Sequence, residues 1–138
     1  MPFFWHKNFK LLTKYLVMKK LLVIDDENDF CNLVKMHCNK KGVECLYANT
    51  LAEGMMLLNN CAPDILILDN NLPDGHGWQK LDYVLNTFPK LKINLVTAKN
   101  IVQKSNILND DKYNRVLHYA KPLSIKQLDN ILHERKMY

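Results

Sequence analysis

Five polar side chains stand where this sequence could support phosphoryl chemistry. Each lies at the end of a short apolar run, and two of them are adjacent. Two carboxylates ~4 Å apart repel each other by roughly 4 kcal/mol at an effective dielectric of ~20, and a divalent cation removes that cost. Ligands that are all oxygen suit Mg²⁺ better than zinc or copper. The five residues are Asp25, Asp26, Asp69, Thr97 and Lys121.

The same residues suit the transfer of a phosphoryl group. Asp69 is the candidate nucleophile, because an aspartate can form an acyl phosphate. Lys121 would place a cation beside the phosphoryl oxygens, and Thr97 would donate a hydroxyl hydrogen bond to them. Taken singly, residues of these types are often helix caps or loop residues. The prediction therefore depends on the five residues acting as a set.

Five short, mostly apolar runs predict the strands that would position this set. Runs of this kind are typical of parallel strands that are buried on both faces. In an open α/β sheet the carboxyl ends of the strands meet at one edge, where ligands bind. The runs are Leu21–Ile24, Val43–Ala48, Asp64–Leu68, Ile93–Val96 and Val116–Ala120.

Helical patterns alternate with these strands. The first predicted helix contains Phe30 and ends at Gly42, and the second begins with a capping box of Thr50 and Glu53. Residues 70–77 are rich in turn-forming types and predict a loop. The other helices are predicted over Trp78–Phe88, over residues 101–112, where the pattern is weak, and after a capping box of Ser124 and Gln127, with Ile125 and Leu128 on the apolar face.

Five β-α repeats predict an α/β fold, a doubly wound five-stranded parallel sheet with helices on both faces. Right-handed crossover connections leave few topologies, and we expect the flavodoxin-like strand order 2-1-3-4-5. The chain of 138 residues has the length of one such domain.

The composition argues against several other classes of protein. No apolar run approaches the ~20 residues that span a bilayer, and we expect a cytoplasmic location. The net charge of +5 depends partly on Lys7, Lys10 and Lys14, so it is weak support for nucleic-acid binding. The four cysteines form no CxxC pair and have no histidine at zinc-ligand spacing, which favours packed thiols in a reducing compartment.

Residues 1–17 differ from the rest of the chain. They are rich in lysines and aromatic residues, and they lack the apolar stretch and cleavage site of a secretory signal. One interpretation is an amphipathic segment that lies on a membrane surface or on a partner. The other, which we favour, is that synthesis starts at Met18 and that the domain spans residues 18–138.

Four segments of the sequence resemble the receiver domains of response regulators. They are LLVIDDEND, DILILDNNLPDGHGW, VTA and HYAKPL, and the resemblance extends from about Lys19 to Arg135. It implies a phosphoacceptor switch of a two-component system, in which a sensor histidine kinase or a histidine phosphotransfer protein donates its phosphoryl group to Asp69. It also implies a regulator that catalyses only its own phosphorylation and dephosphorylation. Because the sequence shows no separate basic domain that could read DNA, we expect the output to be contact with a protein target rather than with nucleic acid.

The resemblance implies a set of Mg²⁺ ligands. Asp26 and Asp69 would bind the ion directly, and Asp25 would act largely through water. The backbone carbonyl of Asn71 would be a further ligand. Asn71 and Lys99 would also lie near the approach of a hydrolytic water, where family members tune the lifetime of the phosphoryl group.

The resemblance also implies a switch that responds to phosphorylation. Thr97 and Lys121 would bind the phosphoryl group, and the family couples this threonine to an aromatic residue three positions before the lysine. That position holds His118, where family members more often have Tyr or Phe. Thr97 would move towards the phosphate and His118 would turn inward, reshaping the surface of the last two helices and the last strand. A histidine there would make the response depend on pH near neutrality, whereas we interpret His76 as a solvated turn residue.

Other functions remain open. A haloacid-dehalogenase-type phosphohydrolase also uses an aspartate nucleophile with Mg²⁺, but it places a second acid two residues later, where this chain has Asn71. An interaction module would keep the pocket without being phosphorylated. A flavin-binding protein of this topology would need a phosphate-binding turn after the first strand, where Asp25, Asp26 and Glu27 would repel the phosphate.

Overall fold

A computed structural model describes residues 18–98 and 110–133 of the chain. The predicted leader at residues 1–17, Lys99 and residues 101–109 of the weak predicted helix lie outside this part. The end of that predicted helix falls in a short 3-10 helix, η3 (Asp111–Tyr113). Among the helices that the structure describes, none has the length and apolar character needed to cross a membrane.

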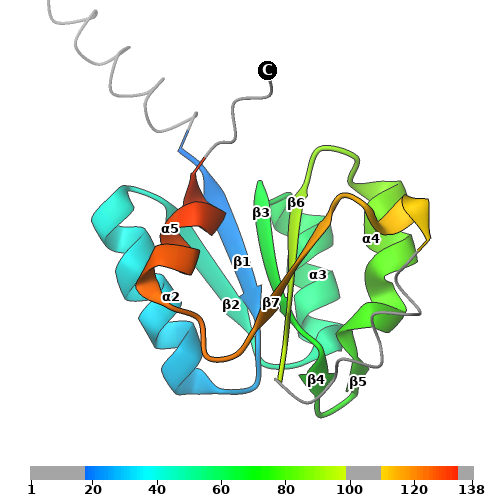
Figure 1. The fold of residues 1–138 in the computed structure, drawn as a ribbon, viewed down its shortest axis with the longest axis horizontal. Helices are drawn as coiled ribbons and strands as arrows, with labels where there is room; N and C mark the ends of the chain where they lie inside the picture. Colours follow the sequence, from blue (N-terminus) through cyan, green and yellow to red (C-terminus); the bar gives the residue numbers. More distant parts are fainter. Residues whose placement is uncertain (1–17, 99–109, 134–138) are drawn as a thin grey trace, which may run out of the picture.

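One parallel sheet forms the centre of the fold (Figure 1). Its strands lie in the order β2-β1-β3-β6-β7, and each pairs in parallel with its neighbours. This order confirms the predicted arrangement 2-1-3-4-5, because β6 and β7 are the predicted fourth and fifth strands. The strands are β1 (Lys20–Ile24), β2 (Glu44–Ala48), β3 (Ile65–Asp69), β6 (Lys92–Thr97) and β7 (Val116–Ala120).

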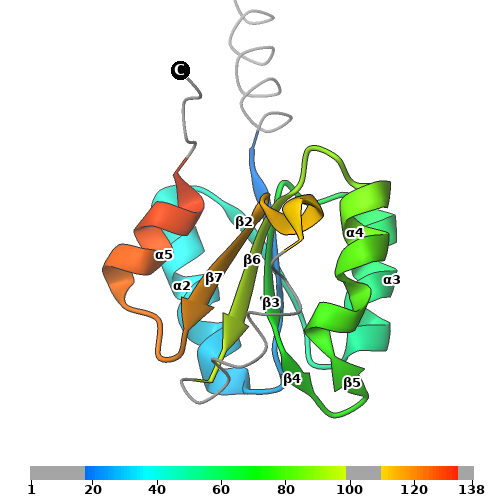
Figure 2. The same cartoon turned by 45° about the vertical axis from the view of Figure 1, so that its right-hand side comes forward.

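Helices cover both faces of the sheet. α2 and α5 lie on one face, and α3 and α4 lie on the other (Figures 1 and 2). The core is divided in the same way: Leu21 and Val23 of β1 pack with α2 and α5, and Leu22 and Ile24 pack with α3 and α4. This is the period-two pattern of a strand buried on both sides. The helices are α2 (Asn28–Lys41), α3 (Leu51–Cys61), η1 (Gly77–Lys80), α4 (Leu81–Thr87) and α5 (Ile125–Leu132).

Most helix ends fall where capping residues predict them. α2 ends at Gly42, whose φ of 71° is a left-handed conformation that glycine adopts without steric cost. Ser124 and Gln127 form the predicted capping box at the start of α5. Ile125 was predicted to lie on the apolar face of this helix, but it does not. It is the first residue of α5, one turn before the buried stripe that begins at Leu128, and it is exposed.

The N-terminus of α3 is capped differently from the prediction. Thr50 Oγ1 accepts a hydrogen bond from the Glu53 backbone N–H, as a capping box requires. The Glu53 carboxylate, however, accepts from the backbone N–H of Asn49 and not from that of Thr50. The backbone N–H groups of the first two residues of α3 donate to the carboxylate of Asp74, at 2.8 and 2.9 Å. Asp74 therefore ties the segment after β3 to this helix.

That segment, predicted as a loop, is more ordered than its turn residues indicate. It contains an antiparallel hairpin of β4 (Asn71–Leu72) and β5 (Gly75–His76). The backbone N–H of Gly77 donates to the carbonyl of Asn70, which closes the hairpin against the end of β3. The predicted helix Trp78–Phe88 is in turn divided into η1 and α4, and the Asn70 side chain accepts from the backbone N–H of Trp78 in η1.

Candidate functional site

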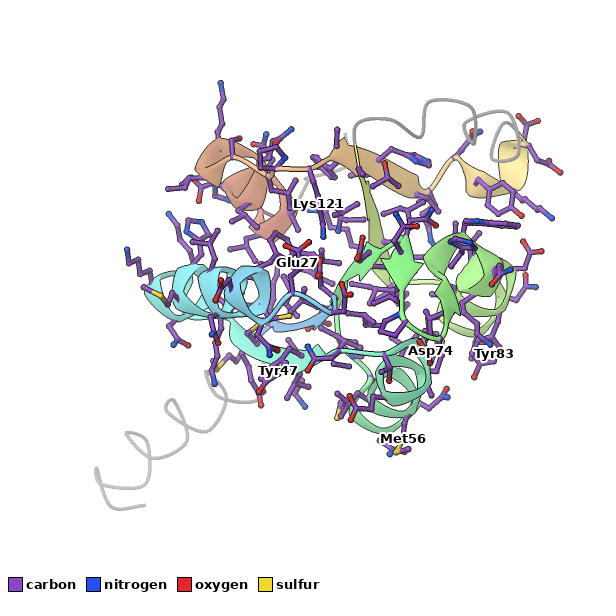
Figure 3. All side chains as sticks on the ribbon, turned by 90° about the horizontal axis from the view of Figure 1, so that it is seen from below. Glu27, Tyr47, Met56, Asp74, Tyr83 and Lys121 are labelled. Carbon is purple, nitrogen blue, oxygen red and sulfur yellow. The ribbon has the colours of Figure 1, made fainter. Side chains whose placement is uncertain are left out.

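Strand ends bring four of the predicted side chains to one edge of the sheet. Asp25 follows β1, Asp69 ends β3, Thr97 ends β6 and Lys121 follows β7. The backbone N–H of Lys121 donates to the carbonyl of Thr97 at 2.8 Å, which fixes the start of the β7–α5 loop. In the view onto this edge in Figure 3, Lys121 and Glu27 lie next to each other at the centre of the molecule.

Lys121 lies at the centre of an acidic group. Its Nζ is 2.8 Å from Oδ2 of Asp25, 3.6 Å from Oδ2 of Asp69 and 3.6 Å from Oε1 of Glu27. Nζ also lies 5.3 Å from the centre of the Phe30 ring, within the range of a cation–π contact. One ammonium therefore balances two buried carboxylates and one exposed carboxylate.

Asp25 is the most constrained residue of the site. It is 1% exposed, and both of its carboxylate oxygens already have donors: the Glu27 backbone N–H on Oδ1 and the Lys121 ammonium on Oδ2. Its backbone carbonyl accepts from the side-chain amide of Asn49 at 2.9 Å. Each carboxylate oxygen of Asp25 therefore accepts one hydrogen bond, and together these bonds fix the orientation of the carboxylate.

The electrostatics of the site raise the pKa of both Asp69 and Lys121. Burial, followed by the charge of Asp25, raises the pKa of Asp69 to about 6, although Lys121 and the Asn71 backbone N–H act against this rise. Burial alone would lower the pKa of Lys121. The hydrogen bond and charge of Asp25, together with the charges of Asp69 and Glu27, outweigh burial and raise that pKa. The lysine therefore stays charged.

Three consecutive acids could hold a metal ion. One carboxylate oxygen from each of Asp25, Asp26 and Glu27 lies within 4.8 Å of the others, and Asp26 and Glu27 are exposed. Asp69 is not part of that group. An open, all-oxygen donor set suits Mg²⁺, which keeps several waters and needs only one or two carboxylates. Glu27 is not among the metal ligands predicted from the sequence, although its position directly after the aspartate pair is a usable signal.

The other residues singled out from the sequence are exposed or only partly buried. Asn71 lies in β4 with an exposed side chain. His76 is exposed, as interpreted, and stacks on Trp78 with ring centroids 6.4 Å apart. Thr97 is partly buried. His118 is exposed on β7, and partial desolvation lowers the pKa of its imidazole, which favours the neutral ring.

Gly77 allows the hairpin to close onto the phosphoacceptor strand. A Cβ atom there would lie 2.5 Å from the backbone oxygen of Asp69 and 2.9 Å from Cγ of Leu68. The substitution Gly77→Ala is therefore expected to push the hairpin away and to lower the free energy of unfolding by about 1–3 kcal/mol, as overpacking does. Urea denaturation measures this change, with the exposed Lys90→Ala as a control that stays close to wild type. Equal stability of Gly77→Ala and wild type would contradict the close approach.

A family model for the response regulator receiver domain matches residues 21–133. The photosynthetic apparatus regulatory protein RegA of Rhodobacter capsulatus is 24% identical over 114 residues, which cover 83% of this chain and 61% of RegA. The chain thus spans less than two thirds of that relative.

Solved structures of receiver domains have the same fold. A two-component response regulator from Clostridium difficile has a TM-score of 0.71 and 27% identity, with 82% of this chain and 91% of that chain covered. The beryllofluoride-activated NtrC4 receiver domain dimer has a TM-score of 0.71 and 22% identity, with 82% and 92% covered. The family model covers most of the sequence, and this chain therefore belongs to the response regulator receiver domain family.

Proposed function

We propose that this receiver domain is a phosphoacceptor switch in which Asp69 accepts the phosphoryl group and Mg²⁺ is the cofactor. The donor is a phosphohistidine on a sensor histidine kinase or a histidine phosphotransfer protein. The output is contact with an unidentified protein target, without direct binding to nucleic acid. The observation that carries this function is the Lys121 ammonium, 2.8 Å from Asp25 and 3.6 Å from Asp69.

The transfer needs little chemistry from the protein beyond positioning. A carboxylate oxygen of Asp69 forms a bond to phosphorus while the bond from phosphorus to the donor imidazole breaks. The electron pair of the broken bond returns to the imidazole, which leaves neutral when its other nitrogen carries a proton. Lys121 then binds the phosphoryl oxygens and Thr97 donates its hydroxyl to them. Asp26, Asp69 and the Asn71 backbone carbonyl would hold Mg²⁺, with Asp25 acting largely through water, and the ion would supply positive charge to the same oxygens.

Phosphorylation changes the surface through Thr97 and His118. Thr97 moves towards the phosphoryl group, and His118 turns into the space that it leaves. The two residues lie on neighbouring strands, because Leu95 of β6, two positions before Thr97, pairs with His118 of β7. Since the neutral imidazole is favoured, the inward movement does not bury a charge at pH 7.

Phosphoryl uptake tests this function directly. Incubation with acetyl phosphate and Mg²⁺ is expected to add the mass of one phosphoryl group, and chelation of Mg²⁺ with EDTA is expected to prevent it. A second receiver domain of established phosphorylation serves as the positive control. No added mass under conditions that label the control would support an interaction module that is never phosphorylated. Repeated turnover of p-nitrophenyl phosphate would support a phosphohydrolase.

A further inference from the structure

Asn70, directly after Asp69, is buried with half of its side-chain amide unpartnered. The residue is 1% exposed. Its Oδ1 accepts a hydrogen bond from the backbone N–H of Trp78 at 3.2 Å, but its Nδ2 has no partner among the residues that the structure describes. A backbone N–H can only donate, so the amide oxygen must face Trp78 and the NH₂ group must face away from it. The orientation of this amide is therefore fixed, and it leaves two N–H donors available inside the protein.

The pairing of β3 with β6 places Asn70 beside Thr97. Asp69 pairs with Val96, and the backbone N–H of Asn70 donates to the carbonyl of Val96 at 3.0 Å. The parallel register therefore continues by one residue, to Asn70 opposite Thr97. Side chains alternate along a strand, so these two follow the face of Leu68 and Leu95, which both belong to the core cluster beneath α3 and α4. Asp69 is directed to the opposite face.

We propose, on the basis of the phosphoacceptor function above, that Asn70 is a positioning residue for Thr97 in the phosphorylated state. Phosphoryl oxygens only accept hydrogen bonds, so the single hydroxyl proton of Thr97 must point at them. The lone pairs of Thr97 Oγ1 are then free to accept, and the Nδ2–H of Asn70, opposite Thr97 in the register, is a donor without a partner in the described part of the chain. The result is a chain of hydrogen bonds from the Asn70 amide through the Thr97 hydroxyl to the phosphoryl group on Asp69, in which each bond strengthens the next.

Asn70 also connects the phosphoryl group on Asp69 to η1, the 3-10 helix that follows the hairpin. While Nδ2 of Asn70 donates to Thr97, its Oδ1 accepts from the backbone N–H of Trp78 in η1. Its backbone carbonyl accepts from the backbone N–H of Gly77. A hydroxyl that moves towards the phosphoryl group is therefore linked to η1 through one planar amide. This link extends the response beyond Thr97 and His118 to the face covered by α3 and α4.

A double-mutant cycle measures the role of Asn70, with beryllofluoride as the phosphoryl mimic at saturating Mg²⁺ and ¹⁹F NMR to count bound mimic. Loss of one hydrogen bond corresponds to a roughly fivefold weaker affinity in Asn70→Ala than in wild type. In a Thr97→Ala background, where the hydroxyl is absent, the same substitution is expected to change affinity less than twofold. Gln79→Ala is the matched control, because Gln79 Oε1 accepts from the His76 N–H at the start of η1 and does not face Thr97. An equal loss in both backgrounds would show that Asn70 acts only by capping η1, and the positioning role would be wrong.

A second measurement needs no substitution at Asn70. The side-chain NH₂ signals of Asn70 in ¹H–¹⁵N spectra are expected to shift when beryllofluoride binds to wild type, and not when it binds to Thr97→Ala. Unchanged signals in wild type that has bound beryllofluoride would overturn the role of Asn70 and leave Asp69 as phosphoacceptor. Wild type that binds no beryllofluoride at all would overturn the phosphoacceptor function itself.

Discussion

Replacement of Asp69 by asparagine is expected to abolish phosphoryl uptake and, in the absence of divalent cations, to stabilise the protein at pH 7. Asparagine keeps the shape of the side chain but lacks the nucleophilic carboxylate, so no acyl phosphate forms. The substitution also removes a negative charge that is 5% exposed and repelled by Asp25. Asp69, the proposed phosphoacceptor, is therefore expected to lower the stability of the folded protein at this pH.

The gain in stability depends on pH in a direction that the pKa fixes. The pKa of Asp69 is raised to about 6 in the folded protein from an ordinary value of 3.8. Between these values the folded chain keeps a proton that the unfolded chain has released, so the wild-type free energy of unfolding falls as pH rises. Asp69→Asn lacks this slope. Its advantage is expected to reach about 1–3 kcal/mol above pH ~6 and to vanish below pH ~4.

Two measurements check both halves of this result. Intact mass after incubation with acetyl phosphate and Mg²⁺ reports uptake, and urea denaturation in EDTA between pH 4 and 7 reports stability. Asp82→Asn is the matched control, because it makes the same chemical change at an exposed carboxylate that pairs with Lys112 away from the site. A phosphorylated Asp69→Asn variant, or one less stable than wild type at pH 7, would contradict the assignment.

The fold was predictable because its signals are local. Each strand is a short apolar run, and each run has polar or turn-forming neighbours that end it. The convergence of Asp25 and Lys121, which are 96 residues apart in the chain, could also be predicted. It follows from the topology alone, since parallel strands place their carboxyl ends at the same edge.

The contacts of side chains across the site could not be predicted in this way. Asp74 caps α3 only because a hairpin brings it there, and a hairpin of two-residue strands has no periodicity to read. The carboxylate of Glu27 and the ring of Phe30 approach Lys121 from the start of α2. Their distances to Nζ depend on where α2 packs against the sheet, which the spacing of apolar residues does not specify.

Lys121→Met is expected to destabilise the protein, because the Lys121 ammonium offsets the repulsion among the carboxylates around it. Without it, Asp25 and Asp69 remain buried, and no other cation of the described residues forms an ion pair with them. Removing one partner of a buried ion pair costs about 3 kcal/mol or more. The free energy of unfolding in EDTA should therefore fall by about 3 kcal/mol, which lowers the melting temperature by roughly 10 °C. Methionine keeps the length and apolar stem of lysine, so packing against Phe30 is retained.

Mg²⁺ should compensate for the missing lysine. The ammonium competes with a metal ion for the carboxylates, so Lys121→Met is expected to bind Mg²⁺ several-fold more tightly than wild type by calorimetry. Added Mg²⁺ should then recover most of the lost stability, while recovery in wild type is smaller. The control is Lys126→Met, which removes an exposed lysine of α5 and should change neither quantity. If Lys121→Met matches wild type in EDTA, or binds Mg²⁺ more weakly, then lysine and metal do not share these carboxylates, and the electrostatic basis of the phosphoacceptor site is wrong.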